Sequence, residues 1–183
     1  MGPSALLYPI QIKKITMITM TSELDCITAK YLEEQVSGDP GASPRIFTVG
    51  YGGRKPEELT ILLCNRGVKT IVDVRLRPDR AAFGAYAKAK TPDKGIEKLL
   101  RGAGLGYASL VELGNPFVDL KDWESRYRRL LDAAGDLLVE RLLLLALPTP
   151  ICLLCCEKDP NQCHRRMIAD FLARRGWTID HIL

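Results

Sequence analysis

The sequence predicts an α/β fold: a three-layer sandwich with a mostly parallel sheet of about five strands. Short runs of apolar and β-branched residues alternate with helical segments from residue 46 onward, as in repeated βα units. The strand runs are continuously apolar, which is typical of a sheet covered by helices on both faces. These two observations define the fold class.

Local signals place the elements along the chain. Proline at position 56, followed by two glutamates, begins a helix, and glycines 67, 104 and 176 end helices. Gly135 falls inside the longest helical stretch and could break it. The expected strands cover residues 46–49, 70–74, 107–110, 151–155 and 177–182, and the expected helices cover residues 56–66, 92–103, 119–145 and 161–175.

Residues 1–44 differ from the rest of the chain. Residues 10–20 carry a strand signal, residues 22–36 a helix signal, and residues 37–44 are rich in Gly, Pro and Ser. We therefore expect an N-terminal extension and linker over residues 1–44, and a single α/β domain over residues 45–183.

Composition narrows the class of protein. No apolar run approaches the roughly 20 residues that cross a bilayer, and the six cysteines are expected to be reduced thiols. We expect a cytoplasmic protein that does not contact a membrane. Residues 45–183 hold 23 basic and 17 acidic residues, a surplus that permits a small anionic ligand or nucleic acid. Aromatic residues are only 7% of the chain, which argues against a dedicated nucleic-acid module.

Polar and reactive residues follow the predicted strands at one edge of the sheet, where open α/β sheets bind ligands. The candidates are Gly50, Tyr51, Asp73, Arg75, Cys155, Glu157, Cys163, His164 and Arg165. Gly50 opens a glycine-rich turn whose amides could hold an anion, although Lys55 replaces the third glycine of a dinucleotide fingerprint. A tight turn that needs positive φ explains the glycines better.

Asp73 and Arg75 end a buried strand and share one of its faces. They are either an acid and an anion-binding guanidinium at the mouth of a cleft, or an ion pair that orders the next loop. Arg77 and Arg80 would add positive field to the same edge, and surface solvation explains these two equally well.

Cys163 lies near the start of the last helix, where the helix dipole and neighbouring bases favour a thiolate. Cys163 is therefore a candidate nucleophile, with His164 or Glu157 as proton carrier. The alternative is a cysteine that packs as a small apolar side chain.

The other thiols allow further interpretations. Cys155, Cys156, Cys163 and His164 could form a zinc set, but paired C-x-x-C motifs are missing and we expect no metal. Cys152 and Cys155 should point to opposite faces of the sheet. Cys155 and Cys163 could form a redox pair if their sulfurs are adjacent.

Several motifs together resemble domain of unknown function family 488. They are residues 48–52 (TVGYG), 72–75 (VDVR), 112–114 (ELG), 154–160 (LCCEKDP) and 163–165 (CHR), and the resemblance covers residues 45–183. The resemblance implies a prokaryotic α/β domain of no settled activity. The family pattern also indicates a set of functional residues: Asp73, Arg75, Cys155, Glu157, Cys163, His164 and Arg165. Tyr51 and Gly52 stand where members often carry histidine and serine, which excludes proton transfer by a histidine there. Cys156 stands between Cys155 and Glu157, where members often carry a small residue.

We therefore expect a candidate enzyme whose cleft binds a small anionic ligand, such as a nucleotide or another phosphorylated compound. Arg75 and Arg165 would hold the anion, and Cys163 would be the nucleophile. Asp73 and Glu157 would handle protons. The alternatives are a non-catalytic module that binds nucleic acid or protein, and a thiol redox sensor. The sequence indicates no cofactor, reaction or oligomeric state.

Overall fold

A computed structural model describes residues 45–146 and 149–183. The predictions for residues 1–44 lie outside these residues. The strands are β1 (Arg45–Gly50), β2 (Thr70–Asp73), β3 (Gly106–Ser109), β4 (Ile151–Cys155) and β5 (Thr178–Ile182). The helices are α2 (Pro56–Asn65), α3 (Gly95–Gly102), α4 (Trp123–Ala146) and α5 (His164–Ala173), with short 3-10 helices η2 (Gly84–Tyr86), η3 (Val111–Leu113) and η4 (Pro160–Gln162).

The five strands form one sheet in the order β3-β2-β4-β1-β5, and every neighbouring pair is parallel. This confirms the predicted fold class. In the register, Gly50 lies beside Cys155, and Asp73 lies beside Leu154. The loops after β1, β2 and β4 therefore leave the sheet together at one edge.

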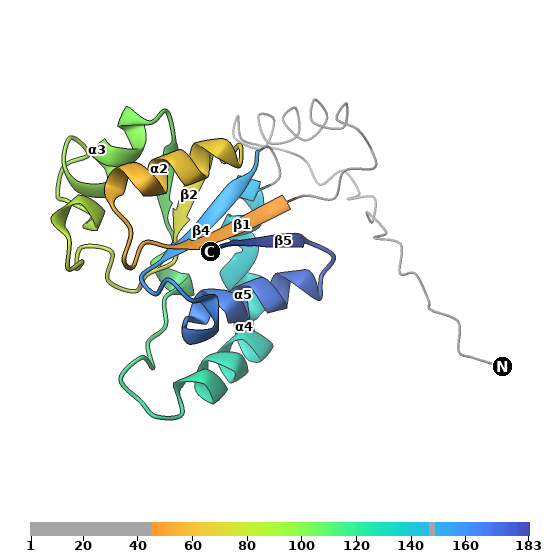
Figure 1. The fold of residues 1–183 in the computed structure, drawn as a ribbon. Coiled ribbons are helices and arrows are strands. Elements are labelled where there is room, and N and C mark those ends of the chain that lie inside the picture. Colours follow the sequence, from red (N-terminus) through yellow and green to blue (C-terminus); the bar gives the residue numbers. More distant parts are fainter. Residues whose placement is uncertain (1–44, 147–148) are drawn as a thin grey trace, which may run out of the picture. The chain divides into compact units, whose positions relative to one another are not determined.

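Helices cover both faces of the sheet, with α2 and α3 on one side and α4 and α5 on the other (Figure 1). Side chains alternate along β4, so Cys152 packs in the core beneath α2 and α3 while Cys155 packs in the core beneath α4 and α5. The predicted separation of these two cysteines is confirmed.

Three helices begin later than the sequence predicts: α3 at Gly95 instead of residue 92, α4 at Trp123 instead of residue 119, and α5 at His164 instead of residue 161. α4 also runs without a break through Gly135, where the sequence left a break open. A Cβ atom at Gly135 would overlap the Phe171 ring of α5. That glycine permits a close helix–helix approach. The stretch predicted as one helix over residues 161–175 is divided: Asp159 caps the short η4, Cys163 is extended, and α5 begins at His164.

Within the part of the chain that the structure describes, no helix combines the length and the apolarity needed to cross a membrane.

Candidate functional site

The glycine-rich turn after β1 packs directly on the backbone that follows β4. The Tyr51 amide donates to the carbonyl oxygen of Cys155 at 3.2 Å, and the Gly52 amide donates to that of Cys156 at 2.8 Å. A Cβ atom at Gly50 would overlap the carbonyl oxygen of Glu157. Gly53 has φ +70°, so positive φ explains this position as predicted. Close backbone approach explains Gly50, and the amides of the turn that meet β4 are occupied.

Asp73 and Arg75 form a buried ion pair, with exposed fractions of 0% and 3%. The Arg75 Nε donates to Asp73 Oδ1 at 2.8 Å, and its Nη2 donates to Asp73 Oδ2 and to the carbonyl oxygen of Tyr86. The Tyr107 hydroxyl donates to Asp73 Oδ2 at 2.8 Å. The attraction of Asp73 raises the pKa of Arg75 despite its burial. These contacts favour the ion pair that orders the loop over a proton-transfer group.

Arg165 is fully buried, and its guanidinium holds the loop that follows β4. Its Nη1 donates to the carbonyl oxygen of Glu157, and its Nη2 donates to that of Lys158 at 2.8 Å. These bonds give two part-buried backbone carbonyls a charged hydrogen-bond partner. The anion-binding function of Arg165 stays a prediction, because this guanidinium is already engaged by the protein.

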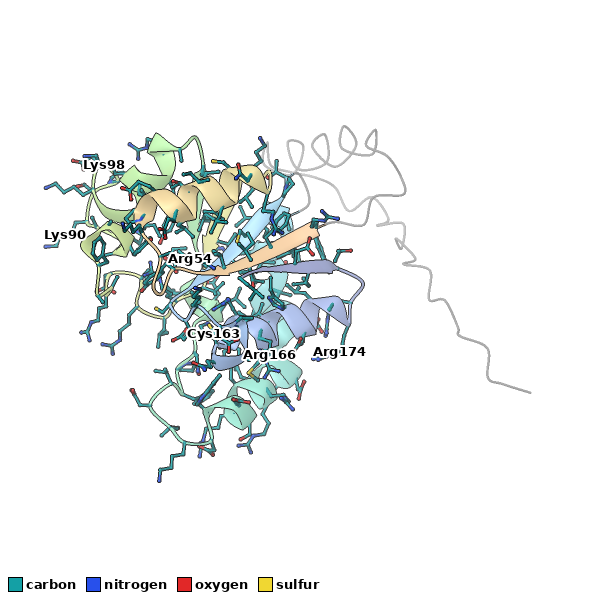
Figure 2. All side chains as sticks on the ribbon, in the orientation of Figure 1. Arg54, Lys90, Lys98, Cys163, Arg166 and Arg174 are labelled. Carbon is teal, nitrogen blue, oxygen red and sulfur yellow. The ribbon has the colours of Figure 1, made fainter. Side chains whose placement is uncertain are left out.

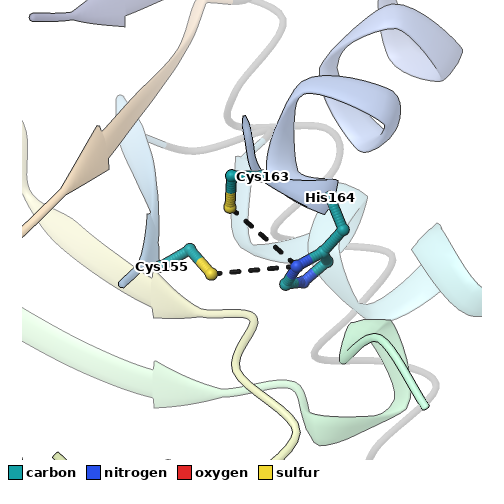
Figure 3. Close-up of side chains that lie close together, drawn as sticks. All are labelled: Cys155, Cys163 and His164. Atoms are coloured by element: carbon teal, nitrogen blue, oxygen red, sulfur yellow. Dashed lines mark hydrogen bonds between the residues drawn. The ribbon is translucent and has the colours of Figure 1, made fainter. Parts of the chain in front are cut away.

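Two sulfurs and one imidazole gather where β4 meets the start of α5. The His164 Nδ1 lies 3.8 Å from the Cys155 Sγ and 3.9 Å from the Cys163 Sγ (Figure 3). All three side chains are buried. Figure 2 places Cys163 at the beginning of α5, with Arg174 at the other end of that helix. We call Cys155, Cys163 and His164 the thiol–imidazole cluster.

One backbone carbonyl and one aromatic ring hold the imidazole in one orientation. The His164 Nε2 lies 2.9 Å from the carbonyl oxygen of Val74, at the end of the strand beside β4. The Tyr127 ring of α4 packs against the imidazole edge to face, with ring centroids 5.3 Å apart. The ring therefore turns its Nδ1 toward both sulfurs.

Proton affinities in the cluster depend on these short contacts. The hydrogen bond from Cys155 and the neighbouring His164 hold the pKa of the Cys163 thiol far below its usual range, against the effect of burial. The pKa of Cys155 is raised, because hydrogen bonds with Cys156 and Cys163 and burial favour its thiol form. Burial and the nearby Cys163 raise the pKa of Glu157.

A cleft of about 470 Å³ opens at the same edge of the sheet. It is lined by Arg75, Leu76, Arg77, Arg80, Asn115, Pro116, Val118, Asp119, Cys155, Cys156, Glu157 and His164. A second hollow of about 700 Å³ shares Arg80, Cys156 and Glu157 with it and also contacts Tyr51 and Gly52. The two hollows meet at the loop that follows β4.

Four predicted site residues line the cleft, namely Arg75, Cys155, Glu157 and His164. Tyr51 lines the second hollow instead. Four others line neither hollow: Gly50, Asp73, Cys163 and Arg165. Cys163 is only 2% exposed, so it lies beneath the cleft wall as a buried thiol. The structure thus gathers the predicted residues but leaves few of them at the surface.

Cys156 is a site residue that was not among the predicted candidates; the sequence placed it only in a possible zinc set and marked it as a departure from the family pattern. It is half-buried, lines both hollows, and accepts a hydrogen bond from the Tyr51 hydroxyl at 3.1 Å. Hydrogen bonds with Cys155 and Tyr51 lower its pKa to about 7. Its place directly after a buried strand was the available signal, because a residue that leaves the sheet edge is free to face the ligand side.

Comparison with known proteins gives one match. The model of the family described as a domain of unknown function, DUF488, matches residues 55–172. No curated protein and no solved structure matches the chain.

Proposed function

The chain belongs to the family of the domain of unknown function DUF488, and because that name assigns no activity, we propose a function from the site itself. The cleft binds a small anionic ligand, such as a nucleotide or another phosphorylated compound. It presents one thiol and one carboxyl group to that ligand, as an enzyme would.

The observation that carries the proposal is a difference among the arginines of this edge. Arg75 and Arg165 are buried, and both guanidinium groups already donate to protein partners, although the Arg165 Nε has no partner among the described residues. Arg77 and Arg80 are exposed on the cleft wall, and neither forms an ion pair within the described residues. Two guanidinium groups with free donors suit phosphate recognition.

The turn that carries these arginines is anchored. The Arg80 amide donates to the carbonyl oxygen of Arg77 at 3.1 Å, and the Lys88 amide donates to that of Pro78 at 2.7 Å. Pro78 is itself buried between the two arginines. An anchored backbone reduces the ordering cost of binding, which supports a built site over a solvated loop.

Cys156 and Glu157 are the groups within reach of a bound ligand. Both are half-buried and line both hollows. We therefore assign to Cys156 the accessible thiol function expected of Cys163. Glu157 keeps its expected function in proton transfer.

A thermal-shift screen over nucleotides, sugar phosphates and oligonucleotides tests the proposal. The variants are Arg77→Ala and Arg80→Ala, and the control is Arg129→Ala, which removes an exposed positive charge from α4 away from the cleft. A ligand at 100 times its Kd stabilises the folded state by about 2.7 kcal/mol. We expect that stabilisation in wild type and Arg129→Ala, and its loss in both cleft variants.

Two results contradict the proposal. One is an unchanged ligand response in Arg77→Ala and Arg80→Ala. The other is a response to oligonucleotides alone with a steep salt dependence, which would indicate the nucleic-acid module that the sequence left open.

A further inference from the structure

We propose that Cys155, Cys163 and His164 form a binding site for one Zn²⁺ ion at the floor of the cleft. The proposal does not depend on the anion-binding function, since the ligands differ from Arg77 and Arg80. The sequence argued against zinc because paired C-x-x-C motifs are missing. The folded chain nevertheless brings three of the four residues of that set together, namely Cys155, Cys163 and His164.

The spacing of the three ligand atoms suits a tetrahedral ion. Zinc lies about 2.3 Å from cysteine sulfur and about 2.0–2.1 Å from histidine nitrogen, so a tetrahedral sulfur and nitrogen lie about 3.6 Å apart. The two sulfur–nitrogen distances here are 3.8 and 3.9 Å, and all three atoms lie within 4.8 Å of one another. Small side-chain movements therefore suffice for coordination.

The histidine is prepared as a ligand. A backbone carbonyl only accepts, so the Val74 oxygen requires a proton on His164 Nε2, 2.9 Å away. In the neutral ring this leaves the lone pair on Nδ1, which faces both sulfurs. Donation of the second ring N–H to a carbonyl is the usual support of a zinc-bound histidine.

The backbone fixes the relative positions of the ligands. Cys155 ends the central strand β4, Cys163 precedes α5, and His164 is the first residue of that helix. η4 and the Arg165 bonds to the carbonyls of Glu157 and Lys158 hold the loop between them. A rigid frame of this kind lowers the cost of assembling a metal site.

The remaining coordination position faces the cleft. Cys155 and His164 line the cleft, whereas Cys163 lies beneath its wall. The Glu157 Oε2 lies 3.5 Å from the Cys155 Sγ and is the nearest candidate for a fourth ligand. Three protein ligands with an accessible fourth position are typical of catalytic zinc sites. Two thiolates would balance the charge of the ion, and binding releases the protons that the ligand atoms still carry.

Metal titration of the reduced, metal-free full chain tests the site. Competition with a chromophoric chelator measures Zn²⁺ affinity, and Co²⁺ reports the ligands by thiolate-to-cobalt charge-transfer absorption and by the d–d bands of four-coordinate cobalt. We expect one ion per chain. Removing a residue that only hydrogen-bonds to a zinc ligand typically lowers metal affinity by about 10–100-fold. Removing a ligand should have a larger effect. We therefore expect Cys155→Ala, Cys163→Ala and His164→Gln each to lower Zn²⁺ affinity by at least about 100-fold.

Matched controls separate this site from the other thiols. Cys64→Ala removes an exposed thiol, and Cys152→Ala removes a buried thiol of the same strand that packs in the core on the opposite face of the sheet. Neither should change Zn²⁺ affinity. Circular dichroism of each metal-free variant checks its fold. X-ray absorption of the zinc-loaded wild type should report two sulfur scatterers and needs no variant.

Four outcomes would overturn the site: no stoichiometric Zn²⁺ binding, a Co²⁺ spectrum without thiolate absorption, X-ray absorption without sulfur neighbours, or loss of affinity in Cys152→Ala equal to that in Cys155→Ala. A Cys155–Cys163 disulfide in a protein that binds no zinc after reduction would identify a redox pair instead.

Discussion

Two pairs of arginines lie at the same edge of the sheet and differ in burial and in the partners of their guanidinium groups. Arg75 and Arg165 are at most 3% exposed, and the terminal nitrogens of both guanidinium groups donate to protein partners. Arg77 and Arg80 are exposed on the cleft wall with no ion pair among the described residues. Arginine close to a candidate site therefore indicates ligand binding only when its donors are free.

Arg75→Met gives the largest effect that this comparison predicts. It leaves the Asp73 carboxylate buried without its charged partner, which typically costs 3–5 kcal/mol. Urea unfolding measures that loss. The matched variant Arg77→Met should stay within about 0.5 kcal/mol of wild type, as surface substitutions usually do. Equal losses in the two variants would contradict the distinction between buried and exposed arginines.

Arg165→Met should cause the second largest loss in the free energy of unfolding. It removes the charged donors to the part-buried carbonyl oxygens of Glu157 and Lys158, and a hydrogen bond to a charged group contributes about 1.5–3 kcal/mol. The same unfolding experiment measures the free energy, and limited proteolysis should cut the loop after β4 sooner. If Arg165→Met keeps wild-type stability but loses the thermal shift caused by anionic ligands, Arg165 binds the ligand and does not serve the loop.

Asp73→Asn in the background of Arg75→Met sharpens the comparison further. The neutral amide removes the uncompensated buried charge while its oxygen still accepts from Tyr107. We expect the double variant to be more stable than Arg75→Met alone, with a coupling energy of about 0.5–3 kcal/mol. A double-mutant cycle in urea gives this value. Additive losses would mean that the ion pair does not dominate the contribution of Arg75.

The combined variant Arg77→Met with Arg80→Met should have the smallest effect on folding. Its free energy of unfolding should change by less than about 1 kcal/mol, since both side chains are exposed. Binding of phosphorylated ligands, measured by calorimetry, should nevertheless be lost, and the wild-type affinity should fall as salt screens the charges. Strong destabilisation of this variant would show that the turn depends on these side chains.

Much of the fold could be predicted because its signals are local. Apolar runs form β1, β2 and β4, and Pro56 begins α2, as the sequence indicates. The parallel sheet follows from the alternation of strands with helices. The edge that carries the polar residues also follows, because the carboxyl ends of parallel strands lie together.

Which polar residues at this edge are available to a ligand depends on tertiary packing. Gly50 and Gly135 serve close approaches to Glu157 and Phe171, partners that lie far away in the sequence. Sequence spacing records neither contact.

The same holds for the thiols and the charged groups. Local sequence signals were sufficient to predict the order of the elements and the position of Cys155, Cys163 and His164 at one edge of the sheet. Only the packed chain buried Cys163, turned Cys156 toward Tyr51 and engaged Arg75 and Arg165. Burial and hydrogen-bond partners arise between distant segments, whereas strand and helix signals are contained within a few neighbouring residues.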